Sequence, residues 1–268
     1  MRHLALILAA ALALTAPPRA MAENFDDIVS AELRPGWRLA NGDHMAALHL
    51  RLSPGWKTYW RAPGDAGIPP QFSWRGSRNL RGVAVLWPTP HVFWQSGMRS
   101  VGYTGDLVLP IRVDPKNEAD DTRLRVVVDI GICKDVCLPH RVRAEAMLPA
   151  SAQRPDPVIA AAMADRPFDG AEAGVSSVTC KVSPVDGGME LRAEIAMPAG
   201  TGREETVIET ADPQVWVSEP RTSWSQGRLI SEARLLHIDG GAFALDRSGL
   251  RITVLDGHVP FELQGCNG

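Results

Sequence analysis

Hydrophobic residues alternate with polar or small residues along several stretches of this chain, and no stretch shows a long helical repeat. The clearest alternating stretches are residues 46–52, 107–113 and 124–130, where apolar residues occupy every second position. A period of two places one set of side chains on one face of a β-strand, so these stretches predict half-buried strands. Turn-forming pairs such as Asn41-Gly42 and Asp186-Gly187 separate the strands. The sequence therefore predicts an all-β protein.

The composition is that of a folded protein without a strong electric field. The chain has 268 residues, of which 45% are hydrophobic and 22% are charged. This balance supports a packed core and excludes a disordered polyelectrolyte. Lys and Arg number 28 against 31 Asp and Glu, a formal charge of −3. A chain of this charge offers no broad positive surface for nucleic acid or an anionic membrane.

The first 22 residues have the pattern of a signal peptide. A basic residue, Arg2, precedes an apolar run from Leu4 to Ala16 that is too short to span a bilayer. Ala20-Met21-Ala22 then gives the small-x-small pattern of a cleavage site. We expect a mature chain that begins near Glu23, is exported to a periplasm and does not insert into the membrane.

The rest of the chain divides by composition into two β-rich parts. Residues 23–150 hold most of the tryptophans, and residues 175–268 again contain short β-like runs with turn signals. Residues 151–174 between them are rich in Ala and Pro, with a short helix expected over residues 158–164. We therefore predict two tandem immunoglobulin-like β-sandwich domains joined by a short linker.

The four cysteines fall into two pairs by their spacing. Cys180 and Cys266 lie on the first and last strands expected in the second domain, and Cys133 and Cys137 enclose three residues. In the chain-entropy model, closing the larger loop stabilises the fold by about 4.6 kcal/mol and closing the smaller by about 2 kcal/mol. We expect Cys180 and Cys266 to form a structural disulfide.

Cys133 and Cys137 have the features of a reactive pair. If the strand alternation continues into the connection, both sulfurs lie on the face away from the core and meet across the turn. Lys134, His140 and Arg141 are nearby in the sequence and favour a thiolate. A reachable sulfur, thiolate character and a second cysteine are what thiol–disulfide exchange requires.

The spacing of Cys133 and Cys137 leaves two other interpretations open. A CxxxC pair also forms a static disulfide that closes a loop. Two thiolates together with His140, His91 or Met98 also make a soft site for Cu(I) or Zn(II). Motifs of hydrolases and nucleotide-binding enzymes are missing from the sequence.

Four segments together resemble the N-terminal periplasmic domain of the DsbD and ScsB thiol:disulfide interchange proteins. They are PGWKTYWRAPGDAG at residues 54–67, WPTP at 87–90, GY at 102–103 and CKDVCLP at 133–139. The resemblance implies an immunoglobulin-like sandwich with one redox-active cysteine pair. Cys133 and Cys137 are then the catalytic pair, and Cys137 enters the mixed disulfide.

The resemblance also implies an aromatic cap over the cysteines. The segment HVFW at residues 91–94 lies where such a cap loop falls, which makes Phe93 or Trp94 a candidate shield. The alternative is that these aromatic residues belong to the core or to an edge strand. Tyr59 and Trp60 line the site in one interpretation and belong to the sandwich core in the other.

Proteins of this type pass reducing equivalents from the membrane to periplasmic thiol proteins, without an added cofactor. DsbD-like chains continue into a membrane domain and a thioredoxin-like domain, and the printed sequence ends at Gly268 with neither. We therefore expect a separate membrane-embedded thiol reductase of the DsbD/CcdA type as electron donor. The expected acceptors are periplasmic thioredoxin-like or disulfide isomerase proteins. The alternative functions are a non-catalytic periplasmic binding module and a copper-handling protein that uses the same cysteines.

Overall fold

The structure, a computed structural model, describes residues 28–267. Strands dominate this range, with one short helix and several sheets, so the predicted all-β class is confirmed. The predicted signal peptide, residues 1–22, lies outside the described residues. No helix between residues 28 and 267 has the length and apolar character needed to cross a membrane.

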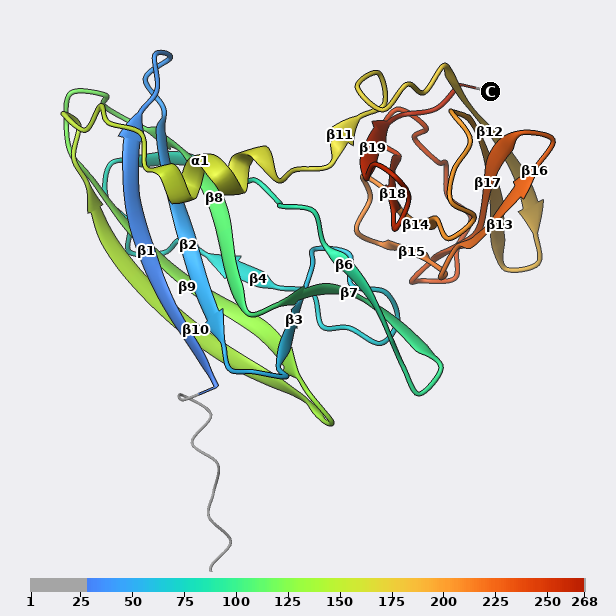
Figure 1. Ribbon diagram of the computed structural model, residues 1–268, viewed down its shortest axis with the longest axis horizontal. Coiled ribbons are helices and arrows are strands. Elements are labelled where there is room, and N and C mark those ends of the chain that lie inside the picture. The colour runs from blue at the N-terminus through green and yellow to red at the C-terminus, as the bar shows by residue number, and fades with distance from the viewer. Residues whose placement is uncertain (1–27, 268) are drawn as a thin grey trace, which may run out of the picture.

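The first part of the chain forms two sheets that share one hydrophobic core (Figure 1). The alternating stretches predicted as strands lie on β2 (His44–Leu52), β8 (Asp106–Pro115) and β9 (Thr122–Cys133). In spatial order, one sheet contains β1 (Val29–Arg38), β2 (His44–Leu52), β8 (Asp106–Pro115) and β5 (Leu80–Val85). The other contains β10 (Cys137–Leu148), β9 (Thr122–Cys133), β3 (Lys57–Tyr59), β7 (Met98–Thr104) and β6 (His91–Gln95), with β4 (Gln71–Ser73) also paired to β9.

Strand β2 is buried on both faces because a helix covers the outer one. Leu48 and Leu50 point into the core between the sheets, whereas Met45 and Ala47 contact Ile159 of helix α1 (Pro157–Ala164). The helix begins after Asp156, whose side chain accepts hydrogen bonds from two free backbone N–H groups of the first turn. Part of the segment between the two β-rich parts is therefore packed against the first sheet.

The second part of the chain forms another pair of sheets around a second core cluster. Figure 1 shows it beside the first pair, in orange and red. One sheet contains β11 (Phe168–Asp169), β19 (Phe261–Gln264), β18 (Arg251–Leu255) and β14 (Glu205–Glu209). The other contains β12 (Ser177–Val185), β13 (Gly188–Ala196), β17 (Arg228–His237) and β15 (Val215–Val217), with β16 (Arg221–Ser225) paired to β17.

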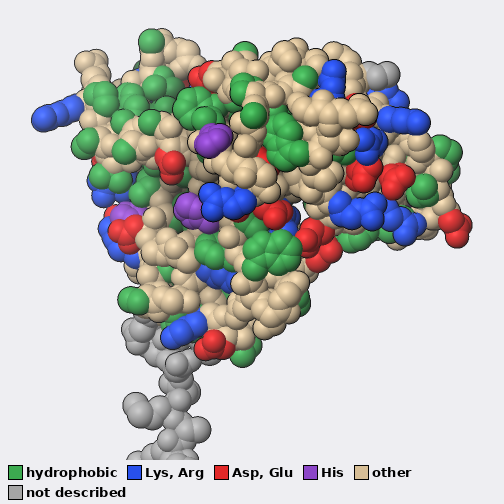
Figure 2. All heavy atoms as spheres, turned by 45° about the vertical axis from the view of Figure 1, so that its right-hand side comes forward, with side chains coloured by type: hydrophobic (Ala, Val, Ile, Leu, Met, Phe, Trp, Pro, Cys, Tyr) green, Lys and Arg blue, Asp and Glu red, His purple; other side chains and the backbone are tan. Residues whose placement is uncertain are grey.

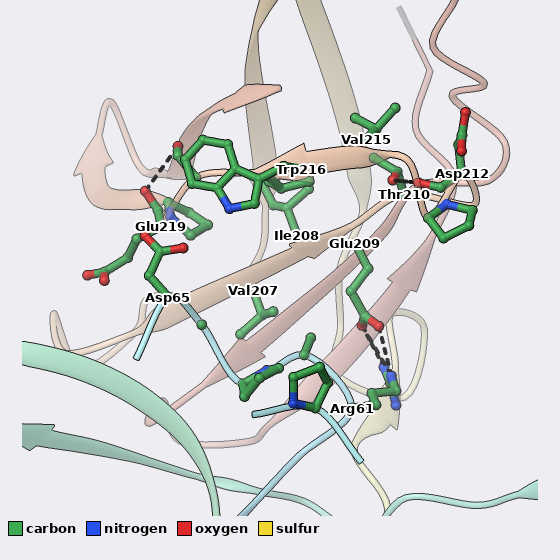
Figure 3. A pocket seen from close by; sticks show the side chains of 18 of the residues that line it. Arg61, Asp65, Val207, Ile208, Glu209, Thr210, Asp212, Val215, Trp216 and Glu219 are labelled. Carbon is green, nitrogen blue, oxygen red and sulfur yellow. Dashed lines mark hydrogen bonds and ion pairs between the residues drawn. The ribbon is translucent and has the colours of Figure 1, made fainter. Parts of the chain in front are cut away.

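Two arginines of the first part, one half-buried and one buried, bind the second part. Arg61 donates to both carboxylate oxygens of Glu209, at 2.9 and 2.8 Å, beside a cleft of about 450 Å³ (Figure 3). Arg99, only 2% exposed, pairs with Glu205 at 3.0 Å and donates to the backbone carbonyl of Thr206. Bidentate and buried contacts of this kind fix an orientation more firmly than exposed ion pairs do.

Charge is mixed on the molecular surface that Figure 2 displays. Acidic and basic side chains alternate over this face, with no extended area of one sign. The arrangement agrees with the near balance of 28 Lys and Arg against 31 Asp and Glu in the sequence.

Candidate redox site

Cys133 and Cys137 are bonded to each other at the end of the β9–β10 hairpin. Cys133 is the last residue of β9 and Cys137 is the first of β10, directly opposite in the register, with 4.1 Å between the Cα atoms. The two residues differ in solvent accessibility, because Cys133 is only 2% exposed and Cys137 is exposed. Only one residue of the pair is therefore open to solvent.

Strand β3 places two polar side chains on the same face of the sheet as Cys133. Lys57 lies opposite Cys133 in the antiparallel register, and Thr58 lies opposite Ile132. Ile132 belongs to the core between the sheets, and Cys133 does not. Because side chains alternate along a strand, Lys57 and Tyr59 share the outer face with the disulfide.

Tyr59 contacts the exposed cysteine directly. Its hydroxyl lies 3.0 Å from Sγ of Cys137 and 3.3 Å from the backbone carbonyl of Ala66. The ring lies against the backbone of Gly131, where an added Cβ would come within 2.8 Å of the ring. Burial raises the pKa of Tyr59, so its hydroxyl keeps its proton and is a donor at neutral pH.

Lys57 is a nearly buried cation beside the disulfide. Its Nζ donates to Oγ of Ser100 at 3.1 Å and to Oε1 of Gln95 at 3.3 Å, and it lies 5.3 Å from the centre of the Phe93 ring. Burial lowers the pKa of Lys57. These partners are neutral, and no carboxylate of residues 28–267 forms an ion pair with Lys57.

The disulfide borders a small pocket of about 120 Å³ between two hairpins. The β6–β7 hairpin forms one side, and its Gln95 donates to the backbone carbonyl of Lys134 in the cysteine turn at 2.9 Å. The pocket is lined by Lys57, Tyr59, Ala66, Gln95, Ser96, Met98, Ser100, Cys133, Asp135 and Cys137.

The aromatic residues expected at the site take different positions. Tyr59 reaches Cys137, whereas Trp60 is fully buried in the sandwich core. Phe93 is half-buried against Lys57, and Trp94 is 58% exposed. Neither Phe93 nor Trp94 lines the pocket, whose outer side is formed instead by the tip of the same hairpin.

The sequence reasoning did not identify Lys57, Gln95 or Ser100 as site residues. Lys57 lies within the motif at residues 54–67. Its position beside Cys133 results from the pairing of β3 with β9, which joins residues 76 positions apart in the chain. A local pattern carries no signal for such a contact. Arg141, one of the cations that the sequence indicated near the cysteines, differs from Lys57 because it is exposed and forms an ion pair with Asp129.

The second cysteine pair lies in the second part of the chain. Cys180 on β12 is bonded to Cys266, which follows β19, with 5.7 Å between the Cα atoms. Cys180 is 2% exposed and packs in the second core cluster. In the described part of the chain, no group of three or more His, Cys, Asp or Glu side chains has a metal-binding arrangement.

We expect Tyr59→Phe to raise the pKa of the Cys137 thiol in the reduced protein by about one unit. Removing a hydroxyl that donates to a charged sulfur costs about 1.5 kcal/mol or more, and 1.36 kcal/mol corresponds to about one pKa unit. The measurement is the ultraviolet absorbance of the thiolate against pH in a Cys133→Ser background. Tyr103→Phe is the control, because its buried hydroxyl donates to Pro88 and touches neither sulfur. An equal shift in both variants would contradict a specific contact.

Comparisons with known proteins relate this chain to one family and to one solved fold. Residues 28–149 match the family described as thiol:disulfide interchange protein DsbD, N-terminal. The N-terminal periplasmic domain of ScsB from Proteus mirabilis has a similar fold, with a TM-score of 0.61, 23% sequence identity, and coverage of 90% of this chain and 92% of that chain. No curated protein sequence matches the chain. Over residues 28–149, the chain therefore has a domain of the DsbD N-terminal family.

Proposed function

We propose that this protein is a periplasmic thiol:disulfide interchange protein whose working group is the Cys133–Cys137 pair. The observation that carries the proposal is the asymmetry of the pair, with an exposed Cys137 in contact with Tyr59 and a Cys133 that is 2% exposed. Exchange needs one sulfur that a partner can reach and a second that resolves the mixed disulfide. The family match over residues 28–149 supports the same assignment.

The exchange proceeds in two steps that conserve atoms and electrons. The Cys137 thiolate of the reduced protein attacks a partner disulfide, forms a mixed disulfide and releases one partner sulfur as a thiolate. The Cys133 thiolate then attacks Cys137, restores the Cys133–Cys137 bond and releases the second partner sulfur. Two electrons pass to the partner, whose thiolates take up the two protons that the cysteines lost. A thiol reductase reduces the pair again by the reverse sequence.

The partners follow from this chemistry and from the family. The donor is a membrane-embedded thiol reductase of the DsbD/CcdA type, and the acceptors are periplasmic thioredoxin-like or disulfide isomerase proteins. Exposed apolar side chains near the cysteines supply a docking surface, since Trp94 and Met98 are each 58% exposed and Val136 is 65% exposed. The chain reaches the periplasm through a cleaved signal peptide over residues 1–22.

The remainder of the chain supports the redox part. We assign residues 23–150 and 175–268 to two tandem immunoglobulin-like domains, with residues 151–174 as the connection. The Cys180–Cys266 disulfide stabilises the second domain and takes no part in exchange. A loop of this length gives a structural disulfide about 4 to 5 kcal/mol of stabilisation in the chain-entropy model.

A glutathione titration tests the proposal. We expect Cys133–Cys137 to change between oxidised and reduced forms across a series of glutathione buffers, with a measurable midpoint potential. Cys180–Cys266 should stay oxidised, because structural disulfides have potentials below about −300 mV. Alkylation of free thiols followed by peptide mass measurement assigns each disulfide separately.

Two results contradict the proposal, one from this titration and one from copper binding. If Cys133–Cys137 resists reduced glutathione as strongly as Cys180–Cys266 does, the first pair is a static staple. If the reduced protein instead binds Cu(I) through Cys133 and Cys137 and shows no exchange with disulfides, the pair handles copper.

A further inference from the structure

One cation faces the disulfide from inside the protein, and no carboxylate between residues 28 and 267 forms an ion pair with it. Lys57 is 9% exposed, lies opposite Cys133 on the neighbouring strand and lines the same pocket as both cysteines. Its hydrogen-bond partners, Ser100 and Gln95, are neutral. A nearly buried ammonium without a countercharge is costly, because burial removes water that would otherwise solvate it.

Reduction of the disulfide supplies the missing anion. The oxidised pair carries no charge, whereas the reduced pair can form a thiolate at the edge of the pocket. The pocket is small, with a volume of about 120 Å³, which is that of about four liquid water molecules. We propose that Lys57 is the positioning residue that stabilises the thiolate of the reduced Cys133–Cys137 pair and thereby favours the reduced form. The inference rests on the proposed exchange function. Lys57 neither gives nor takes a proton in the exchange steps, so the electron and proton balance of exchange is unchanged.

Among the charged and titratable groups around the pocket, Lys57 is the buried cation. From the cysteine turn, Asp135 lines the pocket and opposes a thiolate, and Lys134 is exposed on the same turn. From β3, Tyr59 is the other titratable group. The β6–β7 hairpin contributes the side chains of Gln95, Ser96, Met98 and Ser100, none of which titrates. An interaction inside this pocket is screened by salt much less than one with an exposed lysine.

The two states of the pair act on Lys57 in opposite directions. In the oxidised protein, burial alone acts on Lys57 and lowers its pKa. In the reduced protein, a neighbouring thiolate raises the pKa of Lys57 again, and Lys57 lowers the pKa of the thiol by the same amount. The benefit exists only above the thiol pKa and below the pKa of Lys57, because both sulfurs are neutral below the first and Lys57 is neutral above the second.

The test compares Lys57→Gln with the unchanged protein across pH. Glutamine keeps a polar group near Ser100 and removes the charge. An opposite charge in the same pocket shifts a pKa by about one unit or more, so the thiol of the variant should have a pKa about one unit higher. The equilibrium with glutathione should shift about tenfold toward the disulfide at alkaline pH, which corresponds to about 30 mV, and should not change at acid pH.

Three further variants separate this role from a structural one. Lys57→Arg should retain the low thiol pKa, because the charge is kept. Lys57→Met should repeat the glutamine result. Lys134→Gln removes an exposed charge from the cysteine turn and should shift the titration much less. The oxidised Lys57→Met protein should unfold at an equal or higher temperature, whereas a purely structural lysine would make it less stable.

The results that overturn the inference are distinct from those that overturn exchange itself. The role of Lys57 is rejected if the thiol titration curves of the unchanged protein and of both neutral variants superimpose. If all three proteins still exchange with glutathione, the exchange function itself stands. If the unchanged protein does not equilibrate with glutathione at any ratio of its reduced and oxidised forms, the exchange function and this inference are both rejected.

Discussion

Cys133→Ser should hold Cys137 in a mixed disulfide with its partner, and the adduct should persist at least about a thousandfold longer than in the unchanged protein. A neighbouring thiolate resolves the mixed disulfide at an effective concentration far above that of free thiols, since well-oriented intramolecular groups reach effective molarities of roughly 10⁵ M. Without Cys133, release depends on external thiols. The measurement is the mass of the adduct formed in periplasmic extract, which dithiothreitol should remove.

The reverse substitution provides the control. In Cys137→Ser the remaining sulfur belongs to a residue that is 2% exposed, so its adduct should form far more slowly. Removal of both Cys180 and Cys266 should leave trapping by Cys133→Ser intact and lower thermal stability. Equal adduct formation in Cys133→Ser and Cys137→Ser would show that the exposure difference has no chemical consequence, and absence of any adduct would contradict exchange.

The parts of the fold with strict alternation were predictable from the sequence. Val126, Val128 and Ile130 on β9 are buried at every second position because one face of the strand meets the core between the sheets. Strand β16 could not be predicted, because Arg221–Ser225 has a polar sequence and pairs only as an edge on β17. Local patterning reports which face is buried, and it is silent where neither face is apolar.

Residue patterns alone predicted the covalent part of the candidate site, and the family resemblance added Tyr59 as one of two possible lining residues. Cys133 and Cys137 are close in sequence, so their spacing and the surrounding alternation place both sulfurs together. Tyr59 contacts Cys137 and Lys57 lies opposite Cys133 because both residues are on β3, a strand of three residues whose partners on β7 and β9 lie far away in the chain. In the sequence these residues read as part of an aromatic run, and their contacts follow from the non-local pairing.

The redox pocket is also connected to the junction with the second part of the chain. Arg61 follows β3 by two residues and stacks on Trp60 at 4.2 Å while it binds Glu209 and Glu262. Ala66 lies in the same loop, and its carbonyl is within hydrogen-bond distance of the hydroxyl of Tyr59. One loop therefore contacts the second pair of sheets on one side and the Tyr59–Cys137 contact on the other.

Arg61→Met should destabilise the protein by about 3 kcal/mol and separate the unfolding of its two parts. Methionine keeps the packing of the side-chain stem, but it leaves Glu209 and Glu262, whose side chains are 19% and 30% exposed, with Arg251 as their remaining cation in the described structure. Removing one partner of a fully buried ion pair costs roughly 3 to 5 kcal/mol. The partial exposure of these three side chains and the presence of Arg251 place the expected cost at the lower end of that range. Calorimetry should resolve two transitions in the variant where the unchanged protein shows one.

A matched substitution on the first pair of sheets tests whether position, rather than charge, causes this effect. Arg123 forms a similar bidentate pair with Glu145, but both side chains are more than a third exposed. Arg123→Met should therefore change the stability very little and leave a single transition, because solvent screens an exposed pair. If Arg61→Met also unfolds in one transition at an unchanged midpoint, the Arg61 contacts do not couple the two parts, and the loop at residues 61–66 owes its position to the first pair of sheets alone.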